Sequence, residues 1–568
     1  METSVGAASP EERIGFRTIW LLFVVCSAVS MVIAAMAALN TALADIAPDI
    51  QATSNELTWL IDGYTLALAA LLLPAGFLGD RYGRRLALIG GLIIFAVASL
   101  VTVWITDPNL FIAARCLTGV GAAFVMPATL SLITSGVPES KRPLAVSIWA
   151  GVAGGGAIAG FFVTGVLLEF FSWHSIFIAF AAAAGVMALL SCTIPTSRDS
   201  TSPRFDLLGA LSSATAIALI VFGLIEAPHR GWSDPVVLLA LIGGLALVGV
   251  FWVLQTRRAE PLLDVNLFRN RAFAAGSISI SLQFMVAFGV FFVLLQRLQL
   301  VFGYSPLKSA VALFPMVVVV MIFSLIGNWV AVKVNLRAII GGGIIVMGIG
   351  VILLGAIDHT EYWTIAVSLV VLAAGIGIST APSTTAIMVN TPADNQGVGS
   401  AVNDTSREVG SALGIALTGS LLAAGYTKDV ESTADAAQTQ LQQAASQLEA
   451  AGQVQQAQEA TAAASTVSEH ISRTLAEALQ VAERLAPRQP DLAAQIADGA
   501  KAAFIDPMTT ACFVLGLIAI VGGVLLVILA PNRMGGAGAS TGATSSVDQT
   551  KPTDDEPATN SSTTSLPD

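Results

Sequence analysis

Long apolar runs separated by short polar stretches dominate the chain. A run of 18 or more apolar residues predicts a membrane-spanning helix, because about 20 residues at 1.5 Å each cross the hydrocarbon core of a bilayer. Each run must satisfy its own backbone hydrogen bonds in lipid, so we expect helices and no strands. The pattern predicts fourteen spans: 18–44, 57–79, 86–105, 110–134, 143–168, 173–194, 206–226, 234–255, 272–301, 308–331, 337–357, 362–390, 398–425 and 508–530.

Two polar segments interrupt this plan. Residues 426–506 are rich in Ala and Gln and carry an apolar residue at every fourth position over 467–479. This spacing predicts two antiparallel helices that turn near Gly452, with Pro487 and Pro490 ending the second. The tail after the last span has almost no apolar content, which predicts disorder.

Composition supports a membrane protein and excludes several other classes. Of the 568 residues, 55% are hydrophobic and 11% are charged, whereas soluble domains carry about 25% charged residues. The net charge of −11 comes mostly from segment 426–506 and the tail. No basic stripe is present to bind nucleic acid. The four cysteines are scattered in apolar runs, and we predict no metal site, no cofactor and no enzyme active site.

Orientation follows from the basic residues of the loops. Sixteen Lys and Arg residues fall on one side of the predicted spans, and the short loops of the other side carry only Arg230 and Lys308. Because positive loops stay in the cytoplasm, both termini are predicted to be cytoplasmic. Segment 426–506 is then external. We expect a multi-pass protein of the cytoplasmic membrane.

The loop between spans 2 and 3 combines spaced glycines with opposite charges. It reads Gly-Phe-Leu-Gly-Asp-Arg-Tyr-Gly-Arg-Arg over residues 76–85. Glycines allow close helix packing, and a carboxylate at a helix start is favoured by the helix dipole. Such a cluster can lock one conformation and release it on rearrangement. The candidate conformational residues are Gly76, Asp80, Arg81, Gly83, Arg84 and Arg85.

This loop closely resembles the signature loop of the major facilitator superfamily. Segment 110–123 resembles the fourth-helix motif of that family, with Arg115 as its membrane-embedded arginine. Segments 57–76, 171–178, 261–273, 301–310 and 403–414 look like the fourteen-helix drug:proton antiporter branch of quaternary-ammonium and multidrug exporters.

The resemblance implies an all-α major facilitator fold that alternately opens a central cavity to either side. It implies two six-helix bundles with two inserted helices and an external hairpin. The corresponding units are the N-terminus 1–17, the first bundle 18–194, the inserted helices 206–255, helices 9–13 at 272–425, the external hairpin 426–506, the last helix 508–530 and the disordered cytoplasmic tail 531–568.

Two positions depart from the family pattern. Leu39, with Asn40 beside it, stands where the first helix of the family usually has an aspartate. This chain must do without that carboxylate or use Asp45 instead. Phe161 replaces the proline of the fifth-helix antiporter motif, a residue that shapes a bend in the family.

Charged residues inside the spans are candidate binding sites, because each costs about 2.5–3.5 kcal/mol to insert. Asp62 lies about five residues into span 2, flanked in sequence by Trp59 and Tyr64. A carboxylate beside aromatic rings suits a lipophilic cation, and removal from water would help it hold a proton. The alternative is an acid at the outer edge of the membrane that faces water.

Span 13 carries a second group of charges. Asp404, Arg407, Glu408 and Ser411 share one helix face by their spacing. Asp404 and Arg407 can neutralise each other, which leaves Glu408 as a proton or cation site. Arg115 can serve as a coupling element or as part of a structural ion pair.

Two further residues have both a structural and a functional interpretation. Glu226 at the end of span 7 is a candidate rim acid that we expect to pair with His229 or Arg230. Trp149 in span 5 can stack on a planar substrate, but core packing is an equal alternative.

The leading functional hypothesis is proton-coupled efflux of amphipathic, often cationic compounds, including antibiotics. The driving force would be the proton gradient, and the partners would be small substrates, protons and membrane lipids, with a monomer as the working unit. One alternative is export of an endogenous lipid or cell-envelope precursor, with the hairpin passing cargo onward. A second is a membrane sensor or scaffold that does not transport.

Overall fold

The computed structural model describes residues 15–50, 52, 54–197, 205–357, 361–451, 453–487 and 489–532. Every regular element within these ranges is helical. Fourteen of these helices are long and apolar enough to cross a membrane, as the sequence predicts. The predicted terminal segments 1–17 and 531–568 lie almost entirely outside the described residues.

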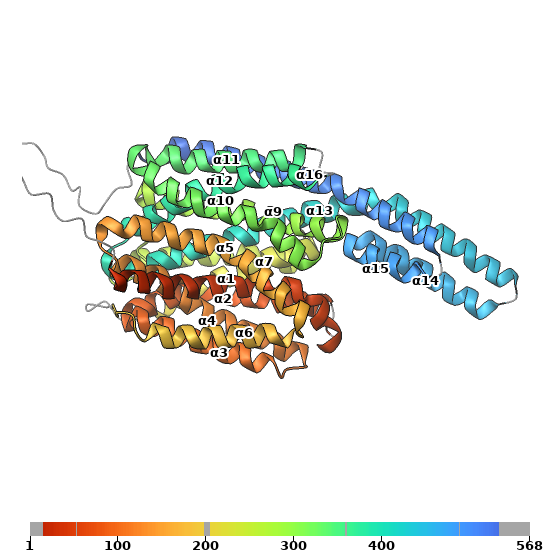
Figure 1. Cartoon of the computed structure of the whole chain (residues 1–568), viewed down its shortest axis with the longest axis horizontal. Helices are drawn as coiled ribbons and strands as arrows, with labels where there is room; N and C mark the ends of the chain where they lie inside the picture. Colours follow the sequence, from red (N-terminus) through yellow and green to blue (C-terminus); the bar gives the residue numbers. More distant parts are fainter. Residues whose placement is uncertain are drawn as a thin grey trace, which may run out of the picture.

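The membrane-spanning helices run roughly along the long axis of the molecule. They form two groups, which lie one above the other in Figure 1. The first group comprises α1 (Phe16–Ile50), α2 (Ser54–Tyr82), α3 (Arg84–Thr102), α4 (Pro108–Gly136), α5 (Arg142–Phe170) and α6 (His174–Ser191). The second comprises α9 (Arg271–Gln296), α10 (Pro306–Lys333), α11 (Leu336–Ala356), α12 (Tyr362–Val389), α13 (Gln396–Ala450) and α16 (Pro490–Leu529). We call these groups the N-bundle and the C-bundle.

The remaining elements connect the bundles or extend them. Two inserted helices, α7 (Leu207–Arg230) and α8 (Pro235–Arg257), pair with each other, and α7 also packs on α2 and α13. Two further helices, α14 (Val454–Arg473) and α15 (Leu475–Leu485), lie beyond the bundles. The short elements are the 3₁₀ turns η1 (Glu139–Lys141), η2 (Val265–Arg269) and η4 (Ala393–Asn395) and the π-helical turn η3 (Arg297–Val301).

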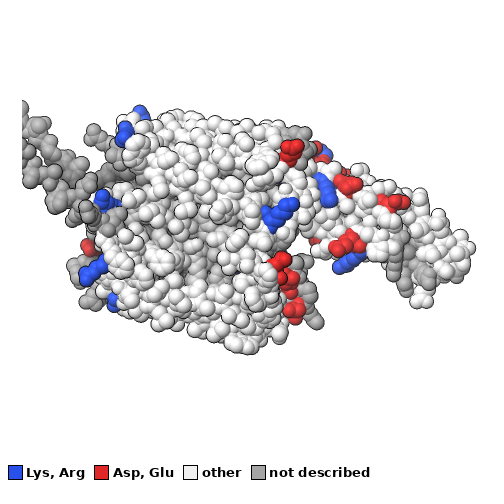
Figure 2. Space-filling view, viewed as in Figure 1, with Lys and Arg blue, Asp and Glu red and all other residues white. Residues whose placement is uncertain are grey.

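Charged residues gather at the two ends of the molecule. Figure 2 shows Lys and Arg mainly at one end of the bundles, and Asp and Glu mainly at the other end and on the protruding helices. A broad band of uncharged surface separates them. Apolar side chains such as Leu239 and Ile242 are exposed on these helices. An exposed apolar side chain suits contact with lipid tails. Some of the helices begin with a polar cap, as where Asp107 accepts a hydrogen bond from the backbone of Leu110.

The external segment differs from the predicted two-helix hairpin. The chain does turn between α13 and α14, at the predicted place, but α13 runs without a break from the membrane to Ala450. The last membrane helix likewise begins at Pro490, well before the predicted start of its span. Both ends of the external segment are thus continuations of membrane helices, and α14 and α15 pack on them (Figure 1). Hydropathy marks where a helix leaves the lipid but does not show whether it ends there.

Residues 426–506 protrude beyond the two bundles (Figure 1) and are called the external bundle for that reason; they have their own apolar core. Ile471 and Ile496 are fully buried there, together with Val430 and Leu475. The hydroxyl of Tyr426 donates a hydrogen bond to the carbonyl of Ile471, at 3.1 Å. Because α13 and α16 are continuous, this core is fixed to the C-bundle.

We expect Ile471→Ala to loosen the external bundle without disturbing the membrane helices. Loss of a fully buried isoleucine side chain costs about 2–5 kcal/mol in a packed core. Hydrogen exchange followed by mass spectrometry should show faster exchange in α14 and α15 and unchanged exchange in α2 and α4. The exposed Val454→Ala is the matched control. Equal protection in the two variants would contradict a packed external core.

Candidate functional site

A cavity of about 310 Å³ lies between the two bundles. Helices α1, α4 and α5 line it on one side, and α9, α10, α12 and α13 line it on the other. Most lining residues are apolar, and the charged ones are Arg407 and Glu408. A cavity that both bundles line is the type of site that rocking of the bundles would expose to each side in turn.

The charged residues of α13 form the polar centre of this region. Asp404, Arg407 and Glu408 are all buried. Arg407 Nε lies 3.9 Å from Asp404 Oδ1, so these two neutralise each other as one of the sequence interpretations predicts. Glu408 lines the cavity, whereas Asp404 is not among the lining residues. Of these two carboxylates, Glu408 is therefore the one that faces the cavity.

A hydrogen-bonded network holds this centre in place. Gln283 of α9 accepts a hydrogen bond from Thr380 of α12 at 2.5 Å and donates one to Ser279 at 2.9 Å. One turn further along α12, Thr384 donates to Asn403, which donates to Asp404 at 3.2 Å. The sequence analysis missed Gln283 and Thr380, which both line the cavity. A glutamine in the middle of an apolar run was the available signal.

Aromatic rings of α9 cover one wall of the cavity. Phe284 and Phe288 stack with ring centres 5.8 Å apart, and Phe288 meets Phe291 edge to face. All three line the cavity. Their spacing of four and three residues places them on one helix face, and this stripe was also overlooked in the sequence. It offers planar surfaces in the same cavity that Glu408 lines.

Arg115 is a buried charged residue of the N-bundle. Its guanidinium donates to the carbonyls of Leu60 and Ala35 and lies 4.6 Å from the centre of the Tyr64 ring. No carboxylate lies within ion-pair distance of it in the described part of the chain. The Tyr64 ring thus packs against a buried arginine of its own bundle.

The three residues predicted to form a cation site in span 2, Asp62, Trp59 and Tyr64, do not all share one face of α2. Trp59 packs on Phe222 of α7, and the Tyr64 hydroxyl donates to the carbonyl of Val32. Asp62 is half-buried and does not line the cavity. A helix turns 100° per residue, so residues 62 and 64 point to nearly opposite faces.

Glu226, the predicted rim acid, is buried near the end of α7. Its carboxylate accepts a hydrogen bond from Arg230 at 2.5 Å, one of the two expected pairings. This contact raises the pKa of Arg230, because the carboxylate stabilises the charged guanidinium. Glu226 also interacts electrostatically with Asp62. The side chain of His229 lies outside the described residues.

Trp149 is fully buried and does not line the cavity. Its indole nitrogen donates to Thr129 at 3.2 Å, and the Arg407 guanidinium lies 4.7 Å from its ring centre. In this structure the Trp149 ring is therefore covered by the side chain of Arg407, in agreement with the packing interpretation. The ring joins the two bundles through a cation–π contact.

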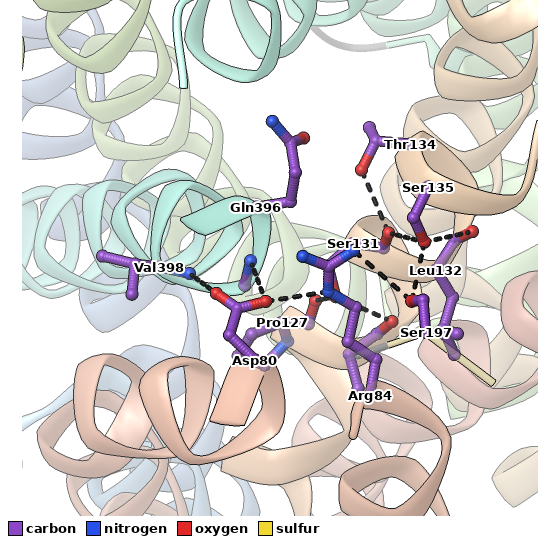
Figure 3. Close-up of polar contacts among 12 residues, drawn as sticks. Asp80, Arg84, Pro127, Ser131, Leu132, Thr134, Ser135, Ser197, Gln396 and Val398 are labelled. Atoms are coloured by element: carbon purple, nitrogen blue, oxygen red, sulfur yellow. Dashed lines mark hydrogen bonds and ion pairs between the residues drawn. The ribbon is translucent and has the colours of Figure 1, made fainter. Parts of the chain in front are cut away.

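A charged lock joins the bundles near their basic end (Figure 3). Asp80 accepts hydrogen bonds from the backbone nitrogens of Gly397 at 2.9 Å and Val398 at 3.1 Å, in the first turn of α13. Arg84 donates to the same carboxylate at 2.8 Å and to the carbonyl of Ala393. A negative charge at a helix N-terminus is stabilised by the helix dipole.

The glycines of the loop 76–85 have separate roles in this lock. A Cβ atom at Gly76 would lie 2.5 Å from the carbonyl oxygen of Gly397, so only glycine allows this approach. Gly83 has a φ of 114°, a backbone conformation that L residues rarely adopt. Arg85 donates to the carbonyl of Ile194 at 3.0 Å, and Arg81 lies over the Tyr82 ring.

The two departures from the family pattern also have structural consequences. Phe161 lines the cavity within an unbroken α5 that contains no proline after its first turn. Asp45 is exposed near the outer end of α1 and is not a cavity residue, so it does not replace the missing acid there. Leu39 is fully buried in apolar packing. Glu408 is thus the acid of the cavity in this chain.

Residues 22–415 match the model of the Major Facilitator Superfamily, which is more than two thirds of the chain. The chain belongs to this superfamily. The chain is similar to the multidrug efflux pump LfrA of Mycolicibacterium smegmatis. The two are 34% identical over 69% of this chain and 78% of the relative. The methyl viologen resistance protein SmvA of Salmonella typhimurium is 31% identical over 72% of this chain and 84% of the relative.

A solved superfamily structure, the proton:xylose symporter XylE, has a similar fold. Its TM-score is 0.50 at 15% identity, over 70% of this chain and 86% of that chain. At this identity the likeness supports the fold alone. Among the described residues no cluster of three or more His, Cys, Asp or Glu side chains could hold a metal ion.

Proposed function

We propose that the protein is a proton-coupled exporter of amphipathic, often cationic compounds, which include antibiotics and antiseptics. One observation carries this proposal: Glu408 is a buried carboxylate that lines the central cavity beside the aromatic wall of α9. A carboxylate and aromatic faces attract a lipophilic cation together. The efflux and resistance names of the curated relatives support the same substrate class.

A proton and a cationic substrate then compete for Glu408. Protonation from outside neutralises the carboxylate and releases the cation outward, and cation binding from inside displaces the proton. The hydrogen bonds of Asp80 hold α2 against the first turn of α13, and in this proposal the lock must break for the bundles to open at that end. Both ligands act on one equilibrium between two states, which is the thermodynamic basis of antiport.

The proposal includes a location and a working unit. The protein would span the cytoplasmic membrane with both termini and the lock of Asp80 in the cytoplasm, because the basic residues gather at that end. The external bundle would then face outward. The protein would act as a monomer surrounded by lipid, driven by the proton gradient, without a bound cofactor and without enzymatic activity.

Proteoliposomes with an imposed pH gradient test this function. We expect ethidium added to wild-type vesicles to drive proton movement, measured with a pH-sensitive dye, and we expect the flux to grow with the gradient. Empty vesicles and vesicles treated with a proton carrier are the controls. Absence of proton flux with every lipophilic cation tested would contradict the proposal.

The same preparation separates the two alternatives. An exporter of an endogenous lipid should move a labelled lipid across the bilayer and ignore ethidium. A sensor or scaffold should move neither, and it should lose its role when the external bundle is loosened by Ile471→Ala. An exporter should retain flux in that variant, because Ile471 lies outside the cavity.

A further inference from the structure

Arg407 occupies the place where a cationic substrate would be most strongly attracted. Its guanidinium lies 4.7 Å from the centre of the Trp149 ring and 4.9 Å from the centre of the Phe284 ring. Asp404 and Glu408 lie on the same face of its helix. Aromatic faces and carboxylates are the groups that bind lipophilic cations. A side chain of the protein therefore already holds this position.

The polar edge of this guanidinium is poorly satisfied. Nε and Nη2 of Arg407 are buried and have no hydrogen-bond partner among the described residues, and the same holds for Oδ2 of Asp404 and Oε2 of Glu408. The 3.9 Å separation of Arg407 Nε from Asp404 Oδ1 is too long for a hydrogen bond. An unpaired buried polar atom costs about 1–3 kcal/mol. A short movement of Arg407 toward Asp404 would let the guanidinium donate hydrogen bonds to the carboxylate. These hydrogen bonds are absent while the guanidinium lies on the aromatic rings.

The contact between Arg407 and Trp149 also crosses the interface of the two bundles. Trp149 belongs to α5 and is tied to α4 by its hydrogen bond to Thr129. Arg407 belongs to α13, which also carries Gly397 of the lock. The position of this side chain therefore affects both the cavity and the joint between the bundles.

We propose that Arg407 is a tethered cation that competes with the substrate for the Trp149 and Phe284 rings, and that a monovalent aromatic cation displaces it. This inference rests on the proposed export function and specifies how the site receives its substrate. The displaced guanidinium forms a hydrogen-bonded pair with Asp404, and the substrate charge then faces Glu408. The exchange removes one contact between α5 and α13, so substrate binding loosens the joint between the bundles.

Two charge-matched variants of the full-length protein test the competition. Arg407→Lys keeps the positive charge but lacks the planar guanidinium that stacks on rings. The double variant Asp404→Asn with Arg407→Gln removes one charge of each sign, so the net charge of the site stays the same while the rings are vacated. We expect both to bind ethidium at least ~10-fold more tightly than wild type, measured by fluorescence anisotropy in detergent at pH 8.

Lys308→Gln is the matched control. It removes a cation that lies 3.7 Å from the centre of the Tyr304 ring, in residues that do not line the cavity. Its ethidium affinity should equal that of wild type. Thermal unfolding checks that each variant is folded, and Arg407→Lys, the smaller change, carries the test if the double variant is not.

The outcomes are separable. Unchanged or weaker binding by the folded Arg407→Lys variant would overturn the tethered-cation inference and leave the export function standing. Failure of the wild type itself to bind any lipophilic cation would instead contradict the proposed function. Tighter binding in both variants, together with slower transport in proteoliposomes, is the result expected if displacement of Arg407 is part of the cycle.

Discussion

Glu408→Gln should abolish proton-coupled transport, with ethidium-driven proton flux in proteoliposomes falling at least ~100-fold, which corresponds to about 2.7 kcal/mol. Glutamine fills nearly the same volume but can neither carry a proton nor attract a cation. Glu408 is the acid of the cavity that remains after Arg407 neutralises Asp404. Ethidium binding to the variant should also lose its dependence on pH between pH 6 and pH 9.

The control for this result is Glu226→Gln. Glu226 is also a buried glutamate in a membrane helix, but it is paired with Arg230 and lies outside the cavity. We expect its flux to stay within about threefold of wild type. Asp62→Asn should behave like this control, because Asp62 does not line the cavity. If Asp62→Asn lost coupling while Glu408→Gln kept it, the assignment of the proton site would be wrong.

Gly76→Val is expected to prevent closure of the basic end of the molecule and to reduce transport at least ~10-fold. A Cβ atom at this position would lie 2.5 Å from the Gly397 carbonyl oxygen and 2.8 Å from the Ala401 Cβ. The Gly397 carbonyl is part of the backbone and cannot rotate away as a flexible side chain can, so we expect α2 and α13 to separate. Overpacking of this kind typically costs about 1–3 kcal/mol. The bonds from Asp80 to Gly397 and Val398 would then lengthen or break.

Cysteine labelling measures this opening directly. Ala401 is fully buried against Gly76, so a cysteine placed there by Ala401→Cys, in a background without the four native cysteines, should be protected in wild type. Gly76→Val should expose it to a maleimide. Gly90→Val is the matched control, because no atom lies within 4 Å of a Cβ there. Equal labelling in both variants would show that Gly76 is not needed for closure.

Much of the fold could be predicted from local sequence. Apolar runs must form helices in lipid whatever their neighbours are, so the fourteen spans followed from hydropathy alone. The loop 76–85 was recognisable because its glycines and charges are consecutive, and the structure brings Asp80 and Arg84 into contact within one turn. The pairing of Asp404 with Arg407 was also predictable, since it depends on helix spacing alone.

Other features required the tertiary structure. Nothing local indicates that Asp80 reaches the backbone of α13, more than 300 residues away, or that Arg407 lies over the ring of Trp149 on another bundle. Both α13 and α16 continue without a break into the external bundle. Hydropathy did not reveal this continuity, because a helix can extend beyond the lipid with polar residues on its surface.

The sequence by itself determined which residues belong to membrane-spanning helices and which charged residues lie within them. Those properties depend on composition and on the geometry of a single helix. The tertiary structure decided which of those charges share a cavity. Asp62 and Glu408 are both acids within predicted spans, yet only Glu408 lines the space between the bundles. The direction of a side chain is fixed by how its helix packs against others, and that packing is set by contacts between distant parts of the chain.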